Sequence, residues 1–296
     1  MRLSTLTKVA AVVAAVVLTA TACGGSSPES GDGPPVADAP TFEAGTTMAR
    51  LAEAGTLRVG TKFDQPGFGL QGLDGTPTGF DVEIAKIIAA GLGIAPDGIT
   101  YTEAPSALRE EVLETDRVDI VAATYTINDA RKERISFAGP YYEAGQTLMI
   151  RSDYTAVTDK ESLRASGARV CTVAGSTPEK NIAEFIDPAQ LTRFDVYSKC
   201  ADALRTNQVD VVTTDNVILT GFVADSDGAF KLTGESFTQE PYGIGITKGD
   251  VAFCEFINTT LQAAAADGSY AAAWDSTAGE ISGEPAPELP AAAPCS

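Results

Sequence analysis

Short apolar segments alternate with amphipathic segments along most of the chain, and this alternation restricts the fold more than any other feature of the sequence. An apolar segment at 57–60 precedes a helical stripe that ends near 91–93, and one at 99–102 precedes a second helix. The pattern continues after residue 146 and includes a long amphipathic helix at 251–265. Such alternation favours βαβ units. We therefore predict an α/β fold with mixed, mostly parallel sheets flanked by helices.

The segment 117–131 joins an apolar run to a group of polar residues. Its first half is typical of a buried strand, and its second half contains two threonines, an Asn-Asp pair and an arginine. In open α/β sheets, ligands lie beyond the carboxyl ends of the strands. An arginine fork with neighbouring hydroxyls can hold a carboxylate through parallel hydrogen bonds. We predict that Thr124, Thr126 and Arg131 bind a small anion.

Residues 1–22 have the basic start, apolar stretch and small terminal residues of a secretory signal, and the apolar stretch is short for a membrane span. Because Cys23 follows directly, the segment resembles a bacterial lipoprotein signal. That resemblance implies a lipid on Cys23 and an extracytoplasmic protein anchored to the cell membrane. Residues 23–45 are rich in Gly, Ser, Pro and Ala, which is the composition of a flexible tether.

The remaining part of the chain, about 250 residues, exceeds one ordinary core, so we expect two lobes. We assign residues 46–145 and 241–296 to lobe 1 and residues 146–240 to lobe 2, because one predicted strand leaves the first lobe and another returns. Two crossings imply a hinge. The net charge of −19, from 21 basic and 40 acidic residues, disfavours nucleic-acid binding.

Five cysteines are present, and setting aside Cys23 leaves an even number in an exported chain, which indicates two disulfides. Three pairings are open, and the local choice is Cys171–Cys200 with Cys254–Cys295. The chain contains no histidine and no CxxC spacing, so we expect neither a metal site nor a cofactor.

Polar residues follow the predicted strands, and because carboxyl ends of strands face one crevice, we expect them to form one ligand site. The candidates are Lys62, Ser106, Arg109, Thr124, Tyr125, Thr126, Arg131, Ser176, Thr177 and Asp215. Taken singly, Ser106, Ser176 and Asp215 are explained by helix capping. For the single tryptophan, Trp274, we predict a structural role.

The charges of this pocket suit a small zwitterion with an additional carboxylate. Three cations less one anion give a net charge of +2, from Lys62, Arg109, Arg131 and Asp215. We expect Arg131, Thr126 and the amides near Ser176 to hold an α-carboxylate. Asp215 and an oxygen of Thr124 are expected to take the α-ammonium.

Several motifs, in this order, resemble the extracellular solute-binding proteins of polar amino-acid ABC transporters: Gly79-Phe80-Asp81-Val82-Glu83-Ile84, Val118-Asp119 through Thr126 and Arg131, Phe137, Pro140-Tyr141, Gly175-Ser176-Thr177 and Thr214-Asp215. The likeness runs from about Leu57 to Ala272. The segment 62–67 and the Cys171/Cys200 pair are most similar to actinobacterial glutamate-binding lipoproteins. The resemblance implies a type II periplasmic-binding-protein-like clamp of two lobes that closes on its ligand, works as a monomer and presents the closed form to a membrane permease.

The resemblance also implies roles for individual residues. Thr126 and Arg131 match positions that hold the α-carboxylate, and Asp215 matches the position that holds the α-ammonium. The positions for an acidic ligand side chain are matched by Lys62, Ser106 and Arg109.

These residues predict a binding protein for an acidic amino acid, L-glutamate or L-aspartate. Glutamine would leave at least one of Lys62 and Arg109 poorly paired, at a cost on the order of 3 kcal/mol. The alternatives are glutamine or another polar amino acid, an amino-acid sensor read by a signalling partner, and a dehydratase. Catalysis is disfavoured, because histidine is absent and the ammonium would occupy Asp215, the one acid placed in the crevice.

Overall fold

The computed structural model describes residues 33–296, which form one compact unit. The predicted signal peptide, the lipidation of Cys23 and the first part of the tether lie outside the described residues. Residues 33–45 contain no helix or strand, but Phe42 packs edge-on against Phe256 with 5.5 Å between the ring centroids. The packed part of the chain therefore begins before residue 46.

The first of two five-stranded sheets combines strands from both halves of the chain. Its order is β5 (Ile99–Glu103), β1 (Leu57–Thr61), β6 (Ile120–Val121), β13 (Glu240–Ile246) and β7 (Ser136–Ala144). β1 pairs in parallel with β5 and β6, whereas β13 is antiparallel to both β6 and β7. Only β13 therefore runs against the other four, which confirms the predicted mixed, mostly parallel sheet.

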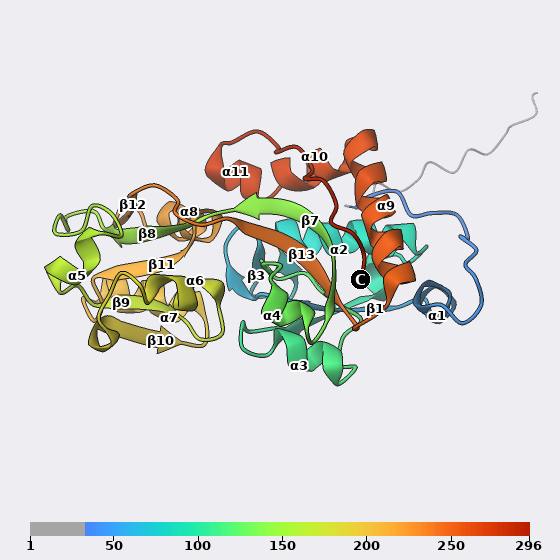
Figure 1. The fold of residues 1–296 in the computed structure, drawn as a ribbon. Helices are drawn as coiled ribbons and strands as arrows, with labels where there is room; N and C mark the ends of the chain where they lie inside the picture. Colours follow the sequence, from blue (N-terminus) through green and yellow to red (C-terminus); the bar gives the residue numbers. More distant parts are fainter. Residues whose placement is uncertain (1–32) are drawn as a thin grey trace, which may run out of the picture. The chain divides into compact units, whose positions relative to one another are not determined.

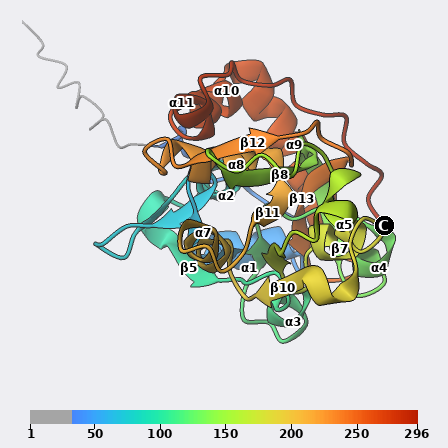
Figure 2. The same cartoon turned by 90° about the vertical axis from the view of Figure 1, so that its left-hand side faces the viewer.

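The second sheet has the same arrangement and comes from the middle of the chain. Its order is β10 (Leu191–Phe194), β9 (Val170–Val173), β11 (Val211–Asp215), β8 (Gln146–Arg151) and β12 (Phe230–Thr233). In Figure 2 the labelled strands β10, β11, β8 and β12 follow one another from bottom to top. β8 is antiparallel to its neighbours β11 and β12, while β9 is parallel to β10 and β11.

Two connections join the sheets. β7 passes through Gly145 into β8, and residues 234–239 lead from β12 to β13. β7 and β13 pair along their length and lie side by side in Figure 1. Glu240, the first residue of β13, is opposite Ala144, the last residue of β7. The two connections therefore lie next to each other.

The helices around the first sheet include two that the apolar pattern predicts. Val82, Ile84 and Ile88 are buried in α2, which ends before Gly93 at a positive φ of 75°. The long C-terminal helix is α9, and it packs against β7 and α2. The helical elements of this part are α1 (Thr47–Ala54), α2 (Phe80–Gly91), η1 (Pro96–Gly98), α3 (Arg109–Glu114), α4 (Asp129–Lys132), α9 (Val251–Asp267), α10 (Ser269–Asp275) and α11 (Ala278–Ser282).

The second sheet carries α6 and α7 against β9 and β11, and α8 against β8 and β12. The helical elements are α5 (Ser162–Ser166), α6 (Thr177–Ile182), η2 (Pro188–Gln190), α7 (Tyr197–Arg205) and α8 (Asn216–Ala224). The sequence predicts a strand over 193–197, which overlaps β10 but extends three residues past its end at Phe194. The cap predicted at Ser198 is wrong, because α7 begins at Tyr197. Tyr197 begins α7 because its side chain is buried in the core of the second sheet. The Ser198 amide donates instead to Asp64 Oδ2 at 3.0 Å.

A small sheet forms between residues 64 and 78, where the sequence predicts a loop containing 65–67 and a turn at 74–77. It consists of β2 (Asp64–Gln65), β3 (Gly69–Gln71) and β4 (Pro77–Thr78). Phe68, between β2 and β3, is buried and packs edge-on against Trp274 with 6.4 Å between the ring centroids. Trp274 also stacks on Tyr142, with its centroid 5.2 Å away. The structural role predicted for Trp274 is therefore confirmed.

Both predicted disulfides are present. Cys171 in β9 is bonded to Cys200 in α7, and Cys254 in α9 is bonded to Cys295 near the C-terminus. The first bridge ties a helix to the second sheet. The second bridge holds the C-terminal segment, whose Ser296 carbonyl also accepts a hydrogen bond from Ser136 Oγ at 2.6 Å.

Removing the first bridge is expected to destabilise the fold. The double variant Cys171→Ser with Cys200→Ser should unfold with a free energy lower by about 3–4 kcal/mol, because the bridge closes a loop with a sequence separation of 29. Urea unfolding followed by circular dichroism measures the difference. The matching Cys254→Ser and Cys295→Ser pair tests a bridge that holds only the tail. An unchanged unfolding free energy in the first pair would contradict this expectation.

Candidate functional site

Tyr125 forms a platform for two arginines beyond the end of β6. Its ring is fully buried, and the Cζ atom of Arg109 lies 4.2 Å from the ring centroid. The Cζ atom of Arg131 lies 4.9 Å from the same centroid. A cation over an aromatic face is attracted by the ring electrons. Tyr125 therefore contributes to the site by holding the guanidinium groups of Arg109 and Arg131 over its ring.

Arg109, the first residue of α3, is 3% exposed. Its Nη1 donates to the carbonyl oxygens of Ala123 and Thr124 at 3.0 and 3.2 Å. Its Nε is buried and has no hydrogen-bond partner within residues 33–296. A guanidinium N–H buried in this way is suited to an anionic ligand atom.

Lys62 follows β1 and lies beside Arg109. Its Nζ donates to Ser106 Oγ at 2.9 Å, and each of these side chains is 3% exposed. Burial, together with the positive charge of Arg109, lowers the pKa of Lys62 to about 7. The capping role of Ser106 is wrong, because α3 begins at Arg109 after an N-cap at Leu108. The Ser106 hydroxyl is therefore available to hold Lys62 at the site.

Arg131 in α4 connects the two sheets. Its Nη1 donates to the Thr126 carbonyl at 2.6 Å, and its Nη2 donates to the Gly175 carbonyl at 3.3 Å. Its Nε lies 3.4 Å from Glu110 Oε1. Burial lowers the pKa of Arg131 to about 10, so the guanidinium stays charged at neutral pH.

Asp215 ends β11 and precedes α8, but its carboxylate does not cap that helix. Oδ2 accepts a hydrogen bond from the Tyr242 hydroxyl at 2.6 Å. Oδ1 is buried and receives no hydrogen bond from any residue that the structure describes. Burial, followed by the negative charge of Glu240, raises the pKa of Asp215 to about 7. An ammonium group at Oδ1 would favour the ionised form.

Ser176 and Thr177 open α6 and use their hydroxyls differently. Ser176 is the N-cap: its Oγ accepts from the Glu179 amide at 3.1 Å and donates to the Val173 carbonyl at 2.7 Å. Helix capping therefore accounts for the role of the Ser176 hydroxyl. The Thr177 hydroxyl instead donates to Glu240 Oε2 at 2.6 Å.

Seven of the ten predicted residues line one small cavity between the sheets: Ser106, Arg109, Thr124, Thr126, Ser176, Thr177 and Asp215. Arg131 lines an adjoining space that shares Ser106, Ser176 and Thr177 with this cavity. Neither Lys62 nor Tyr125 is in the lining, although both contact residues that are. Within residues 33–296, no group of three or more His, Cys, Asp or Glu side chains is placed to hold a metal ion.

Residues 57–276 match the sequence profile of the bacterial extracellular solute-binding proteins, family 3. The chain belongs to this family. It is a solute-binding protein and not an enzyme. No helix in the described part of this solute-binding protein has the length and apolar composition to cross a membrane.

Named relatives cover most of the solute-binding protein. The glutamate-binding protein GluB of Corynebacterium efficiens is 38% identical over 278 residues, covering 89% of this chain and 88% of the relative. The ABC transporter glutamine-binding protein GlnH of Bacillus subtilis is 36% identical over 225 residues, covering 76% of this chain and 81% of that protein.

Solved structures share the fold. An ancestral arginine-binding protein bound to glutamine matches with a TM-score of 0.70 at 32% identity, covering 75% of this chain and 97% of that chain. A solute receptor for L-cysteine of Neisseria gonorrhoeae matches with a TM-score of 0.74 at 26% identity, covering 80% of this chain and 96% of that chain. The predicted type II periplasmic-binding-protein-like fold is confirmed.

Sequence reasoning missed three buried carboxylates of this solute-binding protein. Asp81, Glu110 and Glu240 are 0%, 8% and 2% exposed. Asp81 acts electrostatically on Lys62, and Glu240 acts on Arg131. Counting all charged forms, four carboxylates against three cations change the predicted net charge of +2 to −1. The sequence signal for one of them is the position of Asp81 within the Gly-Phe-Asp motif.

Asp81 lies under the site. Its carboxylate accepts hydrogen bonds from the Thr124 amide at 2.8 Å and from the Tyr141 hydroxyl. Burial raises the pKa of Asp81 to about 7 despite these bonds. Thr124 has a positive φ of 45°, and its hydroxyl donates to Gln65 Oε1 at 3.0 Å. Asp81 and Gln65 thus hold Thr124 in this unusual conformation.

Further residues complete the cavity wall, and the sequence contained no signal that separates them from ordinary core residues. They are Pro178, Tyr197, Thr214 and Ile218. The Tyr197 and Thr214 hydroxyls are buried and have no hydrogen-bond partner within the part of the chain that the structure describes. Both are therefore candidates for contact with a polar ligand.

Proposed function

We propose that this chain is the lipid-anchored, extracytoplasmic substrate-binding subunit of an ABC importer and that it binds an acidic amino acid, L-glutamate or L-aspartate. Lobes 1 and 2 close over the ligand, and the closed monomer docks on the membrane permease. The glutamate-binding relatives and the family support the solute class. The lipid on Cys23 is part of the proposal and rests on the sequence alone.

The proposal rests on two buried groups of opposite charge that line the same cavity. Arg109 has a buried Nε without a partner among residues 33–296, and Lys62 lies beside it on Ser106. Asp215 has an oxygen that is likewise without a partner in this part of the chain. A ligand with an anionic side chain and an ammonium group fits both. Arg131 is left for the α-carboxylate.

Glutamine is the second candidate, and the buried carboxylates favour it. With Asp81 and Glu110 counted, the cations of the site already have anionic neighbours. A neutral amide would then leave less unpaired charge than the predicted net charge suggests. The glutamine-binding relative is consistent with this alternative.

Calorimetric titration decides between the two ligands. The titrated protein is residues 24–296, which contain the whole compact unit, after unfolding and refolding to remove ligand carried through purification. We expect tight binding of L-glutamate or L-aspartate and weaker binding of L-glutamine by roughly a hundredfold. Equal or tighter binding of glutamine would reject the acidic specificity. Binding of none of them would reject the proposed function.

Replacing Lys62 tests the side-chain half of the site. Lys62→Met should lower the affinity for glutamate by about tenfold or more and reduce the preference over glutamine, because the buried ammonium is lost. Lys199→Met is the matched control, since Lys199 is exposed on α7 and pairs with Asp195 at 2.7 Å. The same titrations measure both variants. An unchanged glutamate preference in Lys62→Met would place the ligand side chain elsewhere.

A further inference from the structure

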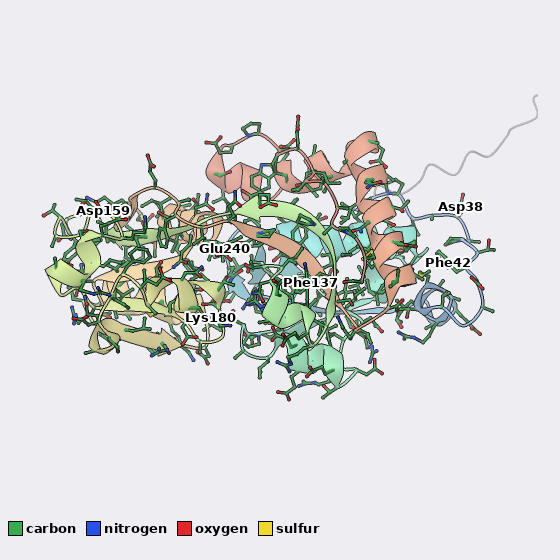
Figure 3. The ribbon with its side chains drawn as sticks, in the orientation of Figure 1. Asp38, Phe42, Phe137, Asp159, Lys180 and Glu240 are labelled. Atoms are coloured by element: carbon green, nitrogen blue, oxygen red, sulfur yellow. A yellow bond between two sulfur atoms is a disulfide. The ribbon has the colours of Figure 1, made fainter. Side chains whose placement is uncertain are left out.

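Glu240 is a buried carboxylate at the junction of the two sheets, and all its hydrogen-bond donors are neutral. It lies between the sheets in Figure 3. Oε2 accepts from Thr126 Oγ1 at 2.8 Å and from Thr177 Oγ1 at 2.6 Å. Oε1 accepts from Asn181 Nδ2 at 3.0 Å and from Thr238 Oγ1 at 2.9 Å. These four bonds use donors from three separate segments.

The donors come from both sides of the cavity. Thr126 follows β6 and forms an isolated bridge with Tyr242 of β13, so it belongs with the first sheet. Thr177 and Asn181 are in α6, which packs on the second sheet. Thr238 lies in the connection itself, two residues before Glu240. The carboxylate therefore joins α6 to the first sheet.

The hydroxyl protons of the two cavity threonines are directed to Glu240. A threonine hydroxyl has one proton to donate and lone pairs to accept. Because Thr126 and Thr177 donate to the same carboxylate oxygen, their oxygens can offer only lone pairs to the cavity they line. The Thr126 hydroxyl therefore cannot donate to an α-carboxylate, which differs from the role expected for Thr126 from the sequence. The two hydroxyl oxygens also lie 3.3 Å from each other, but a hydrogen bond to a charged acceptor is stronger than one between neutral groups, so Glu240 is the favoured acceptor for both.

We infer that Glu240 is a positioning residue of the ligand site, which joins α6 to the first sheet when the lobes are closed and orients the Thr126 and Thr177 hydroxyls as acceptors toward the ligand. The inference rests on the proposed function, because it requires a ligand and an opening motion. Opening separates α6 from the first sheet and breaks bonds to Glu240. The carboxylate therefore slows ligand release and has little influence on ligand entry.

Two variants with matched losses test this inference. Asn181 and Thr238 each make one hydrogen bond to Glu240 Oε1 and one to Gln146. Asn181 Nδ2 donates to the side-chain Oε1 of Gln146 at 3.1 Å. Thr238 Oγ1 accepts from the backbone amide of Gln146 at 3.0 Å. Neither residue lines the cavity. Asn181→Leu removes a link that crosses between the sheets, whereas Thr238→Val removes a link within the connection.

Stopped-flow fluorescence measures association and dissociation rates for whichever of glutamate, aspartate and glutamine binds most tightly. We expect Asn181→Leu and Glu240→Gln to raise the dissociation rate by about tenfold or more and to change the association rate by less than about twofold. Thr238→Val should leave both rates within about twofold of the unsubstituted protein. Melting temperatures are measured in parallel to identify a variant that does not fold.

The outcomes separate the inference from the proposed function. Equal effects of Asn181→Leu and Thr238→Val, or a change confined to the association rate, would overturn the positioning role of Glu240. This comparison remains decisive if Glu240→Gln does not fold. A lower melting temperature with unchanged rates would also overturn it. If the unsubstituted protein binds none of the three amino acids, the proposed function is wrong and the inference is withdrawn with it.

Discussion

Replacing Asp215 by asparagine should lower the affinity for every amino-acid ligand by about a hundredfold or more, because a buried charge partner of the ammonium is removed. Oδ1 is the acceptor left for the ligand, whereas Oδ2 is held by Tyr242. Calorimetric titration measures the loss. Asp225→Asn is the matched control, since Asp225 is exposed at the other end of α8. Equal affinity of both variants would remove Asp215 from the site.

The same substitution should stabilise the ligand-free protein in a pH-dependent way. Folding raises the pKa of Asp215 from 3.8 to about 7, so the unfolded chain ionises first. The carboxylate therefore lowers the free energy of unfolding. This loss grows as the pH rises from 3.8 to about 7 and stays constant above pH 7. Asp215→Asn should melt higher than the unsubstituted protein at about pH 8 and differ little near pH 3. The opposite pH dependence would contradict the assigned cause, which is burial.

Replacing Arg131 by lysine should also lower the affinity for every amino-acid ligand, by about a hundredfold, although the charge is kept. Lysine cannot grip a carboxylate through two parallel N–H groups. It also loses the simultaneous contacts of the guanidinium with the Thr126 and Gly175 carbonyls, one beyond each sheet. Because the α-carboxylate is common to all the ligands, the loss should not depend on the ligand side chain.

Arg205→Lys is the control for this prediction. Arg205 ends α7, is half exposed and pairs with Asp202 at 2.9 Å. Exposed pairs contribute little to stability, so this variant should bind as the unsubstituted protein does. Titration with glutamate and glutamine compares the two variants. A loss confined to glutamate would instead assign Arg131 to the ligand side chain.

The site combines groups that each oppose folding on their own. Burial lowers the pKa of Lys62 to about 7 and raises the pKa values of Asp81 and Asp215 to about 7. Such shifts gather at functional sites, where a ligand supplies the missing partner. The expected gain in stability on losing Asp215 follows from this arrangement.

Much of the candidate site could be predicted from the sequence, because strand ends in an α/β fold converge on one edge. Seven of the ten predicted residues line the cavity for this reason. The role of Tyr125 could not be predicted in this way. Its ring lies under the guanidinium groups of Arg109 and Arg131, and the same local sequence would also fit a ring that contacts the ligand. Likewise, Ser176 caps a helix and Ser106 does not, although both follow strands.

The net charge of the pocket depends on contacts between residues that are far apart in the sequence. Glu240 lies 114 residues from Thr126 and 63 residues from Thr177, yet bonds to both. Asp81 lies 43 residues before Thr124, whose amide it holds. Local patterns do not record contacts over such separations. A pocket charge predicted from strand ends alone therefore omits the buried carboxylates.

The sequence alone determined the alternation of strands and helices, the amphipathic α9 and the even set of cysteines, because periodicity and composition are local properties. The tertiary structure alone decided which polar groups share a cavity and which partners they have. The amide of Ser198 finds Asp64 at a separation of 134 residues, and α7 thus begins against β2. Burial and hydrogen-bond partners come from the packing of distant segments, so only the folded chain assigns them.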